Sequence, residues 1–144
     1  MKKFFLTLAI AVSSIAVFAR EAEVSQKVLD AFNTEFTTAK DVSWTVTKDY
    51  YKATFIYNDR YVFAFYNDEG ELLAMTRYIS SEDLPLTLLT SLRKNYNDYW
   101  ISDLFEMAKH DGTQYVVTIE NADTKLILKA NGGTWTVHQK IRKA

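Results

Sequence analysis

Residues 51–68, YKATFIYNDRYVFAFYND, decide the fold. They form two runs of alternating aromatic and small or polar residues, joined at the turn residues Asn58 and Asp59. A strand that buries one face needs apolar side chains on that face only, yet the second run carries aromatic or aliphatic side chains on both faces. The stretch therefore predicts an antiparallel hairpin with one face in a core and a second face that is also rich in apolar side chains.

Further turn residues on both sides of this hairpin divide the chain into short strands. In the first half we expect strands at about 42–47, 50–57, 60–67 and 71–78, with turns at Lys48-Asp49, Asn58-Asp59 and Asp68-Glu69-Gly70. In the second half we expect strands at about 101–108, 113–120, 124–130 and 134–141, with turns at His110-Asp111-Gly112, Asn121-Ala122 and Asn131-Gly132-Gly133. Consecutive strands joined by such short turns pair antiparallel.

An amphipathic helix precedes each set of strands. Residues 23–38 and residues 84–97 place apolar side chains at helical spacing. Pro85 suits the first turn of the second helix, and Ser81 or Asp83 can cap it. A shift of 60 residues aligns the two helices, and a shift of about 64 aligns the strands that follow them. We therefore predict an α+β fold, a tandem repeat (about 23–79 and 80–142) of one helix plus an antiparallel four-stranded meander. Both helices are expected on one face of a continuous or paired antiparallel sheet.

The first residues, MKKFFLTLAIAVSSIAVFAR, have the pattern of a secretory signal peptide. Lys2 and Lys3 precede an apolar stretch, and the small residues Val17 and Ala19 occupy the positions that a signal peptidase reads. The alternative is an uncleaved membrane anchor, but the stretch is shorter than the roughly 20 residues needed to span a bilayer. We expect a signal peptide over residues 1–19, cleaved after Ala19, and a periplasmic or secreted domain over residues 20–144 without a membrane span.

Composition limits the function classes. The chain has 17 basic and 18 acidic side chains and no cluster of basic residues, which argues against nucleic acid as a partner. It has no cysteine, so disulfides and a lipid anchor on an N-terminal cysteine are both excluded. An exported domain of this composition must be stabilised by its apolar core.

The residues that usually carry catalysis are sparse. The two histidines, His110 in a predicted turn and His138 near the end of the chain, are expected to be solvated surface residues. The acidic run 67–71 lacks the alternating carboxylates of a calcium loop and is expected to be a hairpin turn. We therefore expect no catalytic, cofactor-binding or metal-binding residues, no cofactor and no enzymatic activity.

Several short motifs resemble a known family. They are Phe32 and Phe36, Val42-Ser43-Trp44, Tyr51-x-Ala53-x-Phe55, Asn67-Asp68-Glu69-Gly70 and Ser81-x-Asp83-Leu84-Pro85. With these motifs the sequence resembles the PepSY-like domains of exported Bacteroidetes proteins, which are grouped by fold with the β-lactamase inhibitory protein. The resemblance implies a helix-backed antiparallel sheet with an open face that can clasp a protein. It does not extend to inhibition of a β-lactamase.

The resemblance also decides which side of each strand faces the helices. It places Tyr51, Ala53, Phe55, Val62, Ala64 and Tyr66 toward the helices, and leaves the alternate residues on the open face. The candidate partner-binding face consists of Tyr50, Lys52, Ile56, Tyr61, Phe63, Phe65, Lys125, Ile127 and Lys129. Tyr61, Phe63 and Phe65 are expected to form an exposed apolar patch of the kind that monomers rarely leave uncovered.

Two functions follow from this face. The leading hypothesis is a non-enzymatic exported module that recognises a protein in the cell envelope or outside, as an inhibitor or a chaperone-like factor. The alternative is a structural or accessory envelope protein that self-associates, as a homodimer, and has no soluble partner. Cross-strand aromatic pairs that only stabilise the sheet are a further interpretation of the same residues. A small hydrolase or a ligand carrier is a third hypothesis, which requires a deep pocket with acidic groups of perturbed pKa.

Overall fold

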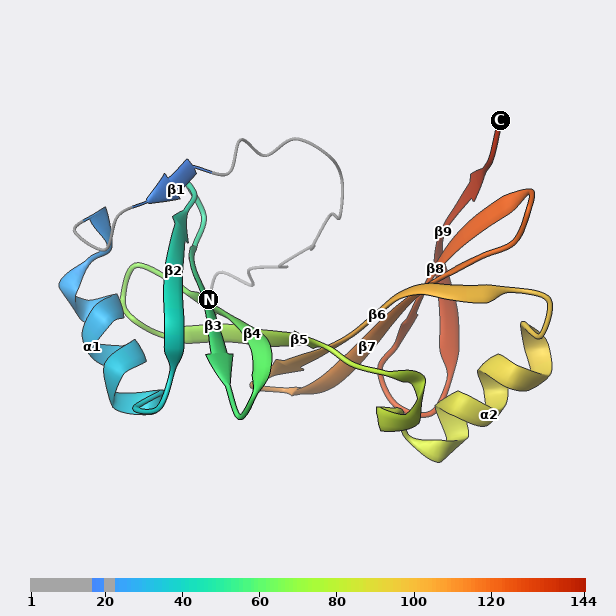
Figure 1. The fold of residues 1–144 in the computed structure, drawn as a ribbon, viewed down its shortest axis with the longest axis horizontal. Helices are drawn as coiled ribbons and strands as arrows, with labels where there is room; N and C mark the ends of the chain where they lie inside the picture. Colours follow the sequence, from blue (N-terminus) through green and yellow to red (C-terminus); the bar gives the residue numbers. More distant parts are fainter. Residues whose placement is uncertain (1–16, 20–22) are drawn as a thin grey trace.

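A computed structural model describes residues 17–19, for which only the backbone is considered, and residues 23–144. Its strands form one antiparallel sheet in the order β1 to β9, with α1 near one end of the molecule and α2 near the other (Figure 1). The elements are β1 (Val17–Ala19), α1 (Gln26–Glu35), β2 (Lys40–Val46), β3 (Tyr51–Tyr57), β4 (Arg60–Tyr66), β5 (Leu72–Tyr78), the 3₁₀ turn η2 (Ser81–Asp83), α2 (Leu86–Asn95), β6 (Trp100–Lys109), β7 (Gly112–Glu120), β8 (Thr124–Ala130) and β9 (Trp135–Arg142).

The predicted tandem repeat is confirmed, and its two meanders form one continuous sheet. Strand β5 of the first meander pairs with β6 of the second, from Met75 opposite Ala108 to Tyr78 opposite Phe105. The register shifts near the start of the first strand of both meanders, between Lys40 and Ser43 in β2 and between Ile101 and Asp103 in β6. The two halves therefore share a local irregularity as well as an order of elements.

Helix α1 covers the first meander with a core rich in aromatic rings. Phe32 lies with its ring centroid 5.2 Å from that of Trp44 on β2 and 5.0 Å from that of Phe55 on β3. The helix starts later than expected because the Ser25 side chain accepts a hydrogen bond from the backbone N–H of Val28, as an N-cap residue does. The residues predicted to face the helix are buried or partly buried here: Tyr51, Ala53, Phe55, Val62, Ala64 and Tyr66.

Helix α2 covers the second meander with a more aliphatic core. Leu88 and Leu92 pack with Leu104, Val117 and other buried residues of β6 to β9. The indole N–H of Trp135 donates a hydrogen bond of 3.0 Å to the carbonyl oxygen of Leu88, which satisfies the one polar atom of that buried side chain. Trp135 is the one buried residue of β9, so this contact ties the last strand to the helix.

Only the end of the predicted signal peptide is described. Residues 1–16 lie outside the described part of the chain, and residues 17–19 form β1 at the edge of the sheet beside β2. Among the described residues, no helix is both long and apolar enough to cross a membrane.

The buried hydroxyl of Tyr66 supports a prediction about alkaline stability. Burial raises the pKa of Tyr66 well above its ordinary value of 10.0, and the negative charge of Glu35 adds to the shift. Because the pKa of the phenol is higher in the folded state than in the unfolded state, its contribution to stability is fully present below the unfolded-state pKa. This contribution is lost as the pH rises through the folded-state pKa. Among the described residues, the hydroxyl oxygen has no hydrogen-bond partner.

We therefore expect Tyr66→Phe to change the free energy of unfolding at neutral pH by less than about 1 kcal/mol, because no hydrogen bond is lost. Above about pH 10 the unmodified protein should lose stability more steeply than the variant. Urea unfolding at several pH values measures both effects. Parallel pH profiles for the two proteins would contradict the prediction.

Candidate interaction surface on the open sheet face

The face of the sheet opposite the helices has a buried apolar cluster of its own. Its members come from β4 to β8 and lie on the face away from α1 and α2, since adjacent residues such as Ala64, Val117 and Leu128 pack in the helix-covered cores. The buried members are Phe65, Ala74, Phe105, Met107, Val116 and Ile127, and the half-buried side chains Tyr50, Phe63 and Leu73 surround them. We call this group the open-face cluster. The side chains of a strongly twisted sheet cover one another here without a third helix.

The structure corrects the expected exposed patch at Tyr61, Phe63 and Phe65. Tyr61 is 61% exposed, but Phe65 is only 5% exposed because it belongs to the open-face cluster. Phe63 is half-buried, with its ring centroid 5.9 Å from that of Tyr78. Ile127, another candidate contact residue, is 6% exposed within the same cluster. Two of the expected contact residues therefore lie beneath the surface.

The other candidate residues are half-buried on the open face. This group comprises Tyr50, Lys52, Ile56, Lys125 and Lys129. They do not form one site: the first three lie on or beside β3 and the two lysines on β8, with the open-face cluster between them.

Two exposed aromatic residues were not predicted for this face. Tyr78, on β5, is 58% exposed and stands opposite Phe105, with the ring centroids 6.4 Å apart. Trp100, at the start of β6, is 53% exposed and stands opposite Glu120. The ammonium group of Lys143 lies 4.8 Å from the Trp100 ring centroid. Their place on this face follows from the β5–β6 and β6–β7 registers.

The charge of the open face is carried mainly by lysines. The Lys52 ammonium lies 4.9 Å from the ring centroid of Phe63, and burial lowers the pKa of Lys52. Burial also lowers the pKa of Lys129, and the nearby positive charge of Lys109 adds to the shift. Within residues 23–144, no carboxylate forms an ion pair with any of these three lysines. These lysines can therefore pair with negatively charged groups of a ligand at the centre of the open face.

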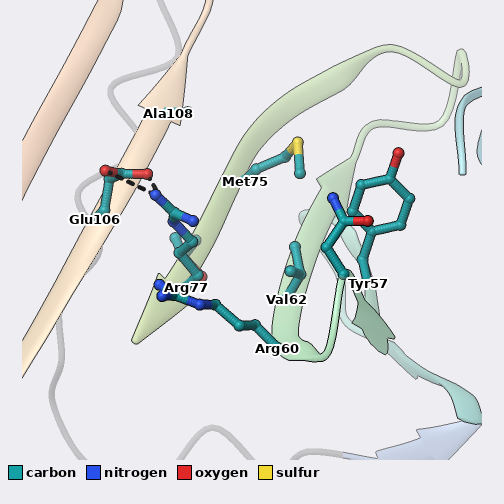
Figure 2. A pocket seen from close by; sticks show the side chains of 9 residues that line it. Tyr57, Arg60, Val62, Met75, Arg77, Glu106 and Ala108 are labelled. Carbon is teal, nitrogen blue, oxygen red and sulfur yellow. Dashed lines mark hydrogen bonds and ion pairs between the residues drawn. The ribbon is translucent and has the colours of Figure 1, made fainter. Parts of the chain in front are cut away.

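A shallow cavity of about 320 Å³ lies on the other face, where the two halves meet (Figure 2). Its walls include Val62, Met75 and Ala108, together with two arginines whose charges are already matched. The Arg77 Nε donates to the Glu106 carboxylate at 2.9 Å, and the Arg60 guanidinium lies 3.6 Å from the Asp83 carboxylate. Because Arg77 and Glu106 lie on β5 and β6, their ion pair joins the two meanders.

The His, Asp and Glu side chains of residues 23–144 are dispersed. No group of three or more His, Asp or Glu side chains in this part of the chain could hold a metal ion. His110, in the turn after β6, and His138, on β9, are both exposed. The Asn67 side chain accepts hydrogen bonds from the backbone N–H groups of Glu69 and Glu71, so the acidic run is a hairpin turn as expected.

The arrangement of helices and strands is similar to that of several solved structures. A BLIP-like protein from Bacteroides fragilis superposes with a TM-score of 0.73 and 22% identity, over 83% of this chain and 88% of that chain. A DUF2874 family protein from Bacteroides uniformis gives a TM-score of 0.72 and 15% identity, over 82% and 88% of the two chains. A candidate periplasmic protein from Bacteroides eggerthii gives a TM-score of 0.73 and 13% identity, over 83% of this chain and 88% of that chain.

These likenesses confirm, at the level of the fold, the resemblance found in the sequence. The chain has the fold of BLIP-like and DUF2874 proteins, two helices each followed by a four-stranded antiparallel meander. No family model matches the chain, and no curated protein matches its sequence.

Proposed function

We propose that the protein is an exported, non-catalytic module that binds another protein through the open face of its sheet. The observation that carries the proposal is the set of exposed aromatic side chains Tyr61, Tyr78 and Trp100 beside the open-face cluster. Exposed aromatic residues held on a rigid apolar base supply large contact area at low entropic cost. Export is supported by the sequence of residues 1–19 and by the name of the candidate periplasmic protein with the same fold.

The candidate contact residues have two roles in this proposal. Tyr50, Lys52, Ile56, Tyr61, Phe63, Lys125 and Lys129 are accessible to a partner, to which the structure adds Tyr78 and Trp100. Phe65 and Ile127 support them from beneath. The lysines without carboxylate partners favour an acidic or neutral protein surface as the ligand.

Self-association through this face is the alternative, and the charges argue against it. In a twofold symmetric dimer the interface is isologous, so the open face of one copy contacts the open face of the other. Each copy would then bring Lys52, Lys109 and Lys129 to the interface, and none of the three has a carboxylate partner within residues 23–144. Like charges held together in an interface disfavour association.

Photocrosslinking tests the proposal in the envelope of the source cells. A photoreactive phenylalanine at position 78 should capture a partner protein, whereas the same group at Leu86, which is 77% exposed on α2, should not. The captured protein is then purified, and its affinity for residues 20–144 is measured by calorimetry. We expect the triple variant Tyr61→Ser, Tyr78→Ser, Trp100→Ser to bind at least about tenfold more weakly, a loss of about 1.4 kcal/mol or more.

A matched variant controls for the loss of apolar surface. Leu86→Ser, Ile101→Ser and Val137→Ser alter exposed apolar residues away from the open face, and should leave the affinity unchanged. Equal weakening by both triple variants would contradict the proposal. Crosslinks at position 78 only between copies of the chain, increasing with its concentration, would instead establish self-association.

A further inference from the structure

The edge of the sheet at β2 is a second surface that can take a partner. In the structure β1 covers this edge, with Val17 opposite Val46, Phe18 opposite Thr45 and Ala19 opposite Trp44. Residues 17–19 are also the last three residues of the predicted signal peptide. Cleavage after Ala19 therefore removes β1, and the backbone groups of β2 that paired with it lose their partners.

The two ends of the mature sheet differ in how well they are protected. An exposed edge strand is normally protected by charged side chains or by a bulge, because its free N–H and C=O groups otherwise pair with other chains. Strand β9 has the basic residues Lys140 and Arg142, and a bulge interrupts its pairing with β8 between Ile127 and Leu128. Both protective features are thus present at the β9 edge.

Strand β2 is protected over only part of its length. Its first residues, Lys40 and Asp41, are charged, the backbone of Asp41 has a φ of 52°, and the register with β3 shifts between Lys40 and Ser43. From Ser43 to Val46 the pairing with β3 is regular, and the segment contains neither a charged residue nor a proline. Strand β1 covers three of these four residues, Trp44 to Val46.

We infer that, after export, the Ser43–Val46 edge accepts an extended, uncharged segment of a partner polypeptide as an added antiparallel strand. The occupant is argued from the strand that the structure places there, since Val17, Phe18 and Ala19 are all uncharged and apolar. Main-chain hydrogen bonds supply the affinity in this mode of recognition, and alternate side chains supply specificity. Trp44, a buried core residue beside β1, and Val46 favour apolar residues opposite them.

This edge acts independently of the open face, although the two adjoin. Thr45 stands opposite Lys52 of β3, so an added strand would extend the open face by one strand beyond β2. The edge binds through backbone groups and the open face through side chains, so a partner can use either surface alone. Loss of binding at the aromatic residues of the open face leaves this inference unaffected.

Nuclear magnetic resonance on the mature protein, residues 20–144, tests the inference with a defined probe. The probe is the capped, uncharged peptide SIAVFA, which corresponds to residues 14–19. We expect it to shift the amide resonances of Ser43 to Val46 and to slow hydrogen exchange at those of the four whose N–H groups point away from β3, while the amides of β9 remain unchanged. Without peptide, these amides should exchange faster in the mature protein than in the chain that retains residues 17–19.

N-methylated peptides separate strand pairing from apolar adhesion. Along an antiparallel strand, alternate residues direct their backbone groups toward the same neighbour. One peptide is N-methylated at Phe18 alone, and a second is N-methylated at Val17 and Ala19. N-methylation that removes an N–H group pointing toward β2 should weaken binding at least tenfold. The peptide whose methylated nitrogens point away from β2 should bind as well as the unmethylated peptide. On the protein, Thr45→Lys should weaken binding, whereas Gln139→Lys on β9 should not.

Several results would overturn the inference. They are the absence of shifts at millimolar peptide, equal binding of both methylated peptides, and shifts spread over the open face. Protection of Ser43 to Val46 that rises with protein concentration without peptide would assign the edge to a second copy of the chain. Recovery of exported protein that retains residues 17–19, determined by mass spectrometry, would show that the edge stays covered.

Discussion

Phe32→Ala should lower the free energy of unfolding by about 3–5 kcal/mol, the loss expected when a buried phenylalanine leaves a cavity. Phe32 joins helix α1 to the sheet, with ring centroids 5.4 Å from Phe36, 5.2 Å from Trp44 and 5.0 Å from Phe55. Since Phe36 and Phe55 also contact each other, with ring centroids 4.9 Å apart, and Trp44 and Phe55 belong to paired strands, the surrounding structure cannot collapse into the space without moving β2 or β3. The cost should therefore fall in the upper part of the range for core truncations.

Urea unfolding measured by circular dichroism gives the free energy directly. Leu92→Ala at the equivalent position of α2 should cost about 2–5 kcal/mol, and Leu86→Ala on the exposed side of the same helix less than about 0.5 kcal/mol. Because one continuous sheet joins the two halves, both core variants should unfold in a single transition. A loss below about 1 kcal/mol for Phe32→Ala would show that α1 contributes little to the stability of the fold.

The periodicity of the sequence was sufficient to predict the fold because each element obeys a local rule. Alternation in residues 51–66, helical spacing around Phe32 and Leu92, and turn residues such as Asn58 act over a few neighbouring residues. The repeat then fixed the order of elements. Helical spacing predicts a start at residue 23, three residues before the observed start of α1, because Val24 continues the apolar pattern beyond the N-cap at Ser25.

The candidate surface was predicted less well because its exposure depends on contacts between distant strands. Alternation together with the family resemblance correctly places Phe65 on the open face, but its burial comes from residues such as Phe105 and Val116, which are about 40 to 50 positions away in the chain. The position of Tyr78 depends on pairing with β6, and that of Trp100 on pairing with β7. Those two registers are set by the twist and packing of the whole sheet, which no local pattern encodes.

Phe65→Ser should lower the free energy of unfolding by about 3–5 kcal/mol, because it leaves a cavity and places a hydroxyl in an apolar cluster. Tyr61→Ser, at an exposed position of the same face of the same strand, should change it by less than about 0.5 kcal/mol. A comparison of these two variants distinguishes the buried residues of the open face, which stabilise the fold, from the exposed residues, which are accessible to a partner. Both variants are compared by urea unfolding under the same conditions.

The contrast between these two variants also decides how binding experiments on this face can be interpreted. If Phe65→Ser destabilises the protein as expected, any loss of a partner in that variant reports on folding, and only variants at Tyr61, Tyr78 and Trp100 report on contact. If Phe65→Ser proves as mild as Tyr61→Ser, the open-face cluster is not a core. The sheet would then be stabilised by its helix-covered face alone, and Phe65 would be free to contact a partner directly.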